Sequence, residues 1–116
     1  MRIRNETTRH IFIIYITTSN REEAKRIARL LLEKRLVACV NIFPKVESIY
    51  WWMGKVEEAE ETAMIAKTTE SKVKEAVNAI KSMHSYEVPA IIAIPIFDGS
   101  ESYIKYVKEE CKEENS

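Results

Sequence analysis

The chain has 116 residues, of which 46% are hydrophobic and 31% are charged, a composition that fits one globular domain and excludes a disordered chain. Lysine plus arginine and aspartate plus glutamate number 18 each, so the formal net charge is zero. A general nucleic-acid binder needs an excess of cations. We therefore predict one domain over residues 1–116 and no nucleic-acid partner.

The cysteines and the hydrophobic runs bear on location. Cys39 and Cys111 are too few for a disulfide framework and lack the close spacing of a metal motif. The apolar run at residues 11–16 is far too short to cross a membrane. Because reduced thiols are typical of the cytosol, the sequence predicts a cytoplasmic protein with no membrane partner.

The charged residues are mainly glutamate, lysine and arginine. Asp98 is the only aspartate, and glutamine is absent. Few thermolabile amides and many charges able to form ion pairs are typical of proteins adapted to heat. We therefore expect a thermostable protein.

The first two elements are predicted to be a strand and a helix. Residues 10–18 are rich in β-branched and aromatic side chains, which favours a strand. Ser19, with Glu22 three residues later, has the spacing of a capping box and predicts a helix start there. Helical spacing then places four apolar residues on one buried face: Ala24, Ile27, Ala28 and Leu31.

Two long strands are predicted over residues 37–52 and 56–69, joined by a turn at residues 53–55. Each arm approaches about 14 residues, or roughly 45 Å if fully extended. This is about twice the usual strand length. Either a bulge splits the arms, or the tip of the hairpin projects beyond its own domain.

The remaining elements complete a known topology. We predict a helix over residues 70–84, a strand over 88–97 and a helix over 100–111 that turns Tyr103, Ile104 and Val107 inward. The order β-α-β-β-α-β plus a terminal helix is the ferredoxin-like α+β pattern with an antiparallel sheet. The prolines agree with this pattern because all three fall in its edge strands, where a missing N–H is tolerated: Pro44, Pro89 and Pro95.

Two of the predicted strands are apolar on both faces. Residues 11–16 and 91–97 are continuous hydrophobic runs, whereas a sheet with one solvated face alternates apolar and polar side chains. The helices of one chain cover only one face. We therefore expect neighbouring subunits to cover the other.

From residue 36 onwards the chain resembles the divalent-cation-tolerance family, CutA. The matching pieces occur in the family's order over about two-thirds of the chain: Ala38-Cys39-Val40-Asn41, Ser48-x-Tyr50-x-Trp52-x-Gly54-Lys55, Glu61, Lys67-Thr68 and His84-x-Tyr86-Glu87-x-Pro89. The resemblance implies a ferredoxin-like subunit in an interlocked homotrimer built like PII signalling proteins. It also implies a role in tolerance of copper and other divalent metals. Ser85 departs from the family, which usually has proline there, and this predicts a less rigid loop.

Cys39, His84 and Glu87 are the candidate metal ligands. Thiolate and imidazole are the donors expected for copper, and a carboxylate adds an oxygen. Each residue also has an ordinary interpretation. Cys39 fits a small buried hydrophobe, His84 a capping or packing residue at a helix end, and Glu87 a solvated charge or an ion-pair partner.

Trp52, Glu61, Lys67 and Tyr86 are candidates for lining a cleft between subunits. Glu61 and Lys67 are separated by an even number of residues, so they point to one face of their strand, either as a buried pair or as a cleft lining. Aromatic residues 50–52 suggest base stacking, but the basic-Gly-aromatic motif of RNA-recognition domains is absent. Packing against a neighbouring subunit is the favoured interpretation.

No catalytic motif is present. The sequence lacks a Gly-rich phosphate loop, an HExxH pair and the anion loop of acylphosphatases, so we predict that the protein is not an enzyme. The leading hypothesis is a homotrimer that binds a divalent metal, copper first, in metal tolerance. The alternatives are a PII-like regulator that binds a small molecule or a protein partner at inter-subunit clefts, and a purely structural scaffold.

Overall fold

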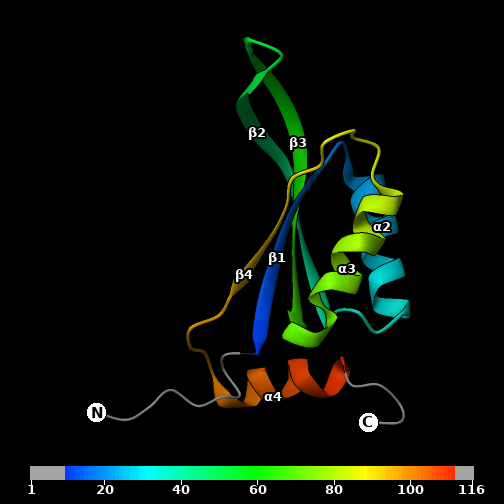
Figure 1. Ribbon diagram of the computed structural model, residues 1–116, viewed down its shortest axis with the longest axis vertical. Coiled ribbons are helices and arrows are strands. Elements are labelled where there is room, and N and C mark those ends of the chain that lie inside the picture. Colours follow the sequence, from blue (N-terminus) through cyan, green and yellow to red (C-terminus); the bar gives the residue numbers. More distant parts are fainter. Residues whose placement is uncertain (1–9, 112–116) are drawn as a thin grey trace.

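The computed structural model describes residues 10–111, which form one four-stranded sheet and three helices (Figure 1). In chain order the elements are β1 (Ile11–Thr18), α2 (Arg21–Glu33), β2 (Cys39–Trp52), β3 (Lys55–Thr69), α3 (Glu70–Met83), β4 (Ile91–Pro95) and α4 (Glu101–Glu110). The sheet is antiparallel with strand order β2-β3-β1-β4. This confirms the ferredoxin-like prediction, with the first and third strands in the centre. None of the helices described is long and apolar enough to span a membrane.

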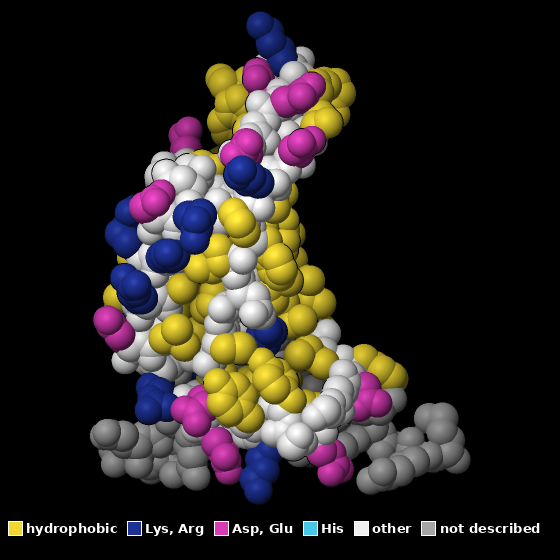
Figure 2. Space-filling model, turned by 180° about the vertical axis from the view of Figure 1, so that it is seen from behind, with side chains coloured by type: hydrophobic (Ala, Val, Ile, Leu, Met, Phe, Trp, Pro, Cys, Tyr) yellow, Lys and Arg dark blue, Asp and Glu magenta, His cyan; other side chains and the backbone are white. Residues whose placement is uncertain are grey.

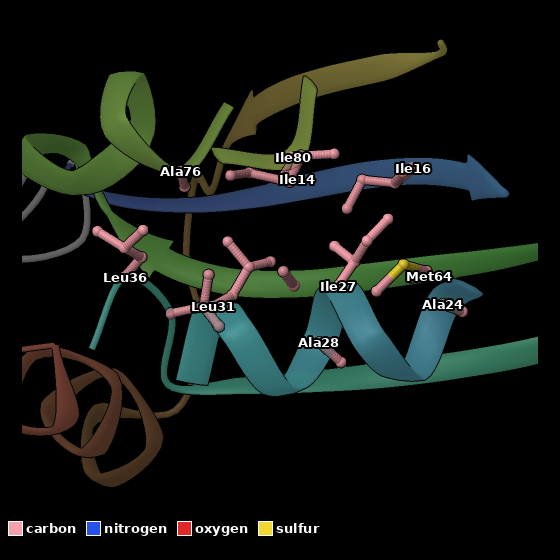
Figure 3. Close-up of a cluster of buried hydrophobic side chains, with 12 residues drawn as sticks. Ile14, Ile16, Ala24, Ile27, Ala28, Leu31, Leu36, Met64, Ala76 and Ile80 are labelled. Atoms are coloured by element: carbon pink, nitrogen blue, oxygen red, sulfur yellow. The ribbon is translucent and has the colours of Figure 1, made fainter. Parts of the chain in front are cut away.

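The main core lies between the sheet and the helices α2 and α3 (Figure 3). Its side chains come from the faces that the apolar spacing predicted, such as Ile14 and Met64 from the strands and Ile27, Leu31 and Ile80 from the helices. A second, smaller cluster lies under α4, where Ile104 and Val107 are buried as predicted. Tyr103 is not buried: it is 42% exposed, although its hydroxyl reaches Cys39 of β2.

The start of α2 differs from the prediction by one residue. The helix is capped by Asn20, whose Oδ1 accepts a hydrogen bond of 2.8 Å from the backbone N–H of Glu23. The capping box predicted from Ser19 and Glu22 is therefore wrong. Asparagine caps a helix as well as serine does. The carboxylate that bonds back to the backbone before the helix belongs to the buried Glu23, which accepts from the N–H of Ser19, whereas Glu22 is exposed.

The β2–β3 hairpin has both of the features that its length predicted. A bulge opens between Phe43 and Val46 in β2, where Pro44 supplies no N–H and Lys45 has a left-handed φ of 62°. Beyond the bulge the hairpin projects past the rest of the chain (Figure 1). Its turn has left-handed φ angles at residues 53 and 54, the pattern of a tight type I′ turn.

Pro89 corrects the prediction for the fourth strand. The strand β4 spans Ile91–Pro95, whereas we predicted residues 88–97. Pro89 therefore lies before the strand, and only Pro95 ends it. The loop from residue 84 onwards is held by contacts with β1 and α2, so it does not extend the sheet.

The face of the sheet opposite α2 and α3 is largely uncovered within one chain, and we call it the open face. Strand alternation places on it the side chains at positions 13 and 15 of β1 and those paired with them in β3 and β4. Among these, Ile92 and Ile94 are 52% and 47% exposed. Hydrophobic side chains gather along the sheet in the space-filling view (Figure 2).

Candidate functional site

Glu23 joins two loops at one end of the sheet. Its side chain is buried, and Oε1 accepts hydrogen bonds from the backbone N–H (2.9 Å) and the hydroxyl (2.8 Å) of Ser19. Its Oε2 accepts a bond of 2.7 Å from the backbone N–H of Ser85. We call this arrangement, with His84 and Tyr86, the loop clamp. It fixes the loop after β1 to the loop after α3.

The electrostatics of the loop clamp keep Glu23 charged. Burial alone would raise the pKa of its carboxyl. The hydrogen bonds from Ser19 and Ser85 outweigh that effect and lower the pKa from 4.5 to about 2. Glu23 is therefore an ionised, buried carboxylate at neutral pH, compensated by these hydrogen bonds; Nδ1 of His84 also lies 3.8 Å from its Oε2.

Ser85 contributes a bond that the usual family residue could not make. We predicted a less rigid loop because proline is absent here. The structure gives Ser85 a backbone N–H bond to Glu23, and proline has no N–H to donate. The serine of this chain therefore adds a backbone hydrogen bond to the buried carboxylate.

His84 is held by the backbone through both ring nitrogens. Its Nε2 donates to the carbonyl oxygen of Thr17 at 2.7 Å, and its Nδ1 accepts from the backbone N–H of Tyr86 at 3.1 Å. This pairing defines a neutral imidazole with the proton on Nε2. The side chain has no exposed surface. In this conformation His84 has no lone pair to offer a metal ion.

Tyr86 and Glu61, two of the residues predicted to line a cleft, contact each other beside His84. The Tyr86 hydroxyl donates to Oε2 of Glu61 at 2.7 Å, and its ring lies 4.7 Å from the His84 ring. Burial, and then the Glu61 carboxylate, raises the pKa of Tyr86 well above its usual value. The phenol is therefore a permanent hydrogen-bond donor to Glu61 at physiological pH.

A second polar group lies towards the other end of the sheet. Cys39 Sγ and the Tyr103 hydroxyl are 3.0 Å apart, and Lys67 Nζ donates to Oδ1 of Asn41 while lying 5.9 Å from the centre of the Tyr103 ring. We call these four residues the thiol–lysine cluster. Burial, and then the bond to Cys39, raises the pKa of Tyr103 to about 12.

The predicted metal ligands are not brought together within one chain. Cys39 pairs with Lys67, which pairs with Ile13 of β1, whereas His84 contacts Thr17 at the far end of that strand. Within residues 10–111, no group of three or more His, Cys, Asp or Glu side chains could hold a metal ion. One chain therefore does not fit the three-ligand site proposed from Cys39, His84 and Glu87. Glu87 is exposed in the loop after α3.

Trp52 joins neither group. It lies in the projecting part of the hairpin, paired with Lys55 next to the turn, and is partly exposed. Sequence reasoning missed Glu23, Asn41 and Tyr103. The only sequence signal for Glu23 was its place three residues after Asn20, which is where the glutamate of a capping box lies.

The topology, the projecting hairpin and the uncovered sheet face define a ferredoxin-like α+β protein whose polar residues lie at the loops and on the open face. A sequence model of the family described as CutA1 divalent ion tolerance protein matches residues 12–110. The chain belongs to this family.

Relatives and solved structures agree with this assignment. The chain is 52% identical to Divalent-cation tolerance protein CutA of Archaeoglobus fulgidus, over 83% of this chain and 93% of that protein. It is 43% identical to human Protein CutA over 82% of this chain, but spans only 53% of that protein's length. The crystal structure of CutA1 from Oryza sativa superposes with a TM-score of 0.87 at 40% identity, covering 93% of this chain and 99% of that one.

The cytoplasmic location predicted from the two thiols is wrong as a general conclusion. A relative from Oryza sativa, Protein CutA 1, is described as chloroplastic; it is 40% identical over 92% of this chain, which spans 60% of its length. The solved CutA from Archaeoglobus fulgidus is described as periplasmic; its TM-score is 0.85 at 49% identity, over 88% of this chain and 99% of that one. Free cysteines fit several compartments, so they do not identify one.

Proposed function

We propose that the protein takes part in divalent cation tolerance as a homotrimer that binds a divalent metal ion, copper first, between its subunits. Cys39 carries this proposal, because it is a partly exposed thiol on a sheet face that one chain leaves largely uncovered. A thiolate is the soft donor that copper favours. Since one chain does not supply three ligands around Cys39, the further ligands come from another subunit.

The assembly is supported by the apolar surface of one chain. Ile92 and Ile94 are about half exposed on the open face, and Trp51 and Met53 are 74% and 87% exposed on the projecting hairpin. Large apolar side chains left exposed on the sheet face and on the hairpin mark surfaces available for interaction. The family resemblance supplies the number of subunits, three.

Titration calorimetry with Cu(II), Zn(II) and Co(II), without oxygen, tests the metal. We expect micromolar or tighter copper binding that is lost in Cys39→Ala. It should persist in Cys111→Ala, a control that removes the other, buried thiol. His84→Ala should retain copper affinity where it remains folded, because its nitrogens are used by the backbone.

The proposal fails if all the variants bind copper as weakly as each other. Light scattering on the same samples reports the assembly separately, and a monomer at micromolar concentration would contradict the trimer. This pairing separates a wrong ligand from a wrong oligomeric state.

A second candidate function is favoured by the thiol–lysine cluster. Lys67 interacts with a neutral amide and an aromatic ring, which suits a PII-like regulator that binds a small molecule in an inter-subunit cleft. A thermal-shift screen of metabolites tests it, since a ligand specific for the folded state raises the melting temperature. Heat adaptation and the lack of enzymatic activity stay predictions. A melting temperature in the mesophile range would count against the first.

A further inference from the structure

The sheet register aligns four residues in one row across the open face. Cys39 of β2 pairs with Lys67 of β3, Lys67 with Ile13 of β1, and Ile13 with Ile94 of β4. Directly paired residues of antiparallel strands share a face. The row therefore runs from a thiol and an ammonium group to two isoleucines, so that one half is polar and the other apolar.

Lys67 is the charged member of this row, and its charge is not balanced within the described residues. Its Nζ donates to Asn41 Oδ1 and lies over the Tyr103 ring, and none of the ion pairs described in residues 10–111 includes it. Lys67 is also half-buried on a central strand. A half-buried cation without an anionic partner is costly, and it becomes more costly when a neighbouring subunit covers the face.

We propose that this row binds a small organic monocarboxylate with an apolar body. The carboxylate lies against Lys67 and Asn41, and the apolar body extends over Ile13 and Ile94. The inference rests on the proposed assembly, because a neighbouring subunit encloses the ligand from the side that faces solvent in one chain. It also names a class of ligand, monocarboxylates, for the inter-subunit cleft of the second candidate function, the PII-like regulator.

The chemistry of the site favours a carboxylate over a phosphate. Lys67 supplies one positive charge, which balances a carboxylate but not a phosphate dianion. The Asn41 oxygen accepts from Lys67, so the amide N–H groups of Asn41 remain to donate to a second ligand oxygen. The neighbouring isoleucines offer no polar atoms and suit a hydrocarbon chain.

Calorimetry on the intact assembled protein, in a chelator and without added metal, provides the test. The probes are hexanoate, its neutral analogue hexanamide and inorganic phosphate. We expect hexanoate to bind at least about tenfold more tightly than either of the others, as a charge-assisted hydrogen bond implies. Lys67→Met should weaken hexanoate binding by a similar factor, and the control Lys74→Met on α3 should leave the affinity for hexanoate unchanged.

Asn41→Asp is a second, independent variant at an exposed position. It places a carboxylate beside Lys67, and we expect it to abolish hexanoate binding. The proposal is overturned if hexanoate binds no better than hexanamide, if phosphate binds more tightly, or if both Lys67→Met and Asn41→Asp bind hexanoate like wild type. It is also overturned if wild type ignores hexanoate and Lys67→Met dissociates, since Lys67 then serves an ion pair between subunits.

These readouts separate the inference from the proposed function. Copper binding is measured through Cys39→Ala with metal present, and hexanoate binding through Lys67 and Asn41 with metal removed. Light scattering on each variant shows whether a loss of binding follows a loss of assembly.

Discussion

The loop clamp and the open face differ in how far a single chain provides their hydrogen-bond partners and buries their apolar side chains. In the loop clamp, Glu23 accepts three hydrogen bonds and both nitrogens of His84 are used, all within one chain. On the open face, Ile92 remains about half exposed and Lys67 has a neutral partner. The comparison shows that the clamp is completed within one chain, whereas the open face is left uncovered, which is why we propose that a second molecule covers it.

A charged substitution on the open face should have the largest effect, a loss of assembly. We expect Ile92→Lys to prevent assembly, because it places an unpaired charge in an apolar interface. Light scattering should then report the 13.5 kDa single chain, about one third of the mass of the proposed trimer. Leu32→Lys, on the exposed side of α2, is the matched control and should assemble normally. An Ile92→Lys variant of unchanged mass would show that the open face is not the interface.

Breaking the loop clamp should destabilise the chain without a specific effect on assembly. Glu23→Ala removes the acceptor of two backbone N–H groups and one hydroxyl, which we expect to cost about 3 kcal/mol of unfolding free energy. Denaturant unfolding at fixed protein concentration measures it. Glu22→Ala, an exposed neighbour on the same helical turn, should change stability by less than about 0.5 kcal/mol. Equal losses in both variants would contradict the role of the clamp.

The same carboxylate predicts a pH dependence. The pKa of Glu23 is lowered to about 2 in the folded chain from 4.5, so its stabilisation is complete above pH 4.5 and is lost as pH falls towards 2. By pH 3 the loss should be about 2 kcal/mol. Unfolding measured between pH 7 and pH 3 should show this loss in wild type, and Glu23→Gln should lack this part of it. Parallel pH profiles for the two proteins would refute the assignment.

The smallest change in the free energy of unfolding should come from Ser85→Pro, which introduces the usual family residue. It removes one hydrogen bond to Glu23, worth about 1 kcal/mol, and proline recovers part of that loss by restricting the unfolded chain. We expect a net loss of less than about 1 kcal/mol by denaturant unfolding. A loss as large as that of Glu23→Ala would mean that this loop bond dominates the clamp.

The fold was predictable because its signals are local. Apolar spacing such as Ile27 and Leu31 in α2 fixes a buried face, and the order of strands and helices read along the chain matches the ferredoxin-like pattern. The candidate site was predictable only in part. The parity of Glu61 and Lys67 correctly places them on one face, but sequence order does not tell that Cys39 and His84 lie towards opposite ends of the sheet. That separation depends on the pairing register, which no single motif contains.

The bulge near Pro44 also determines the orientation of the hairpin aromatics. Two residues of β2, Pro44 and Lys45, oppose a single residue of β3 there, since Phe43 pairs with Ala63 and Val46 with Glu61. Alternation is therefore inverted beyond this point, and even-numbered residues of β2 turn to the open side.

Tyr50 and Trp52 thus share a side with Glu61, and Trp51 points the other way. Deleting one residue of the bulge would exchange the two sets and present Trp51 where Trp52 now lies. One extra backbone unit therefore selects which indole lies on the same side as Glu61.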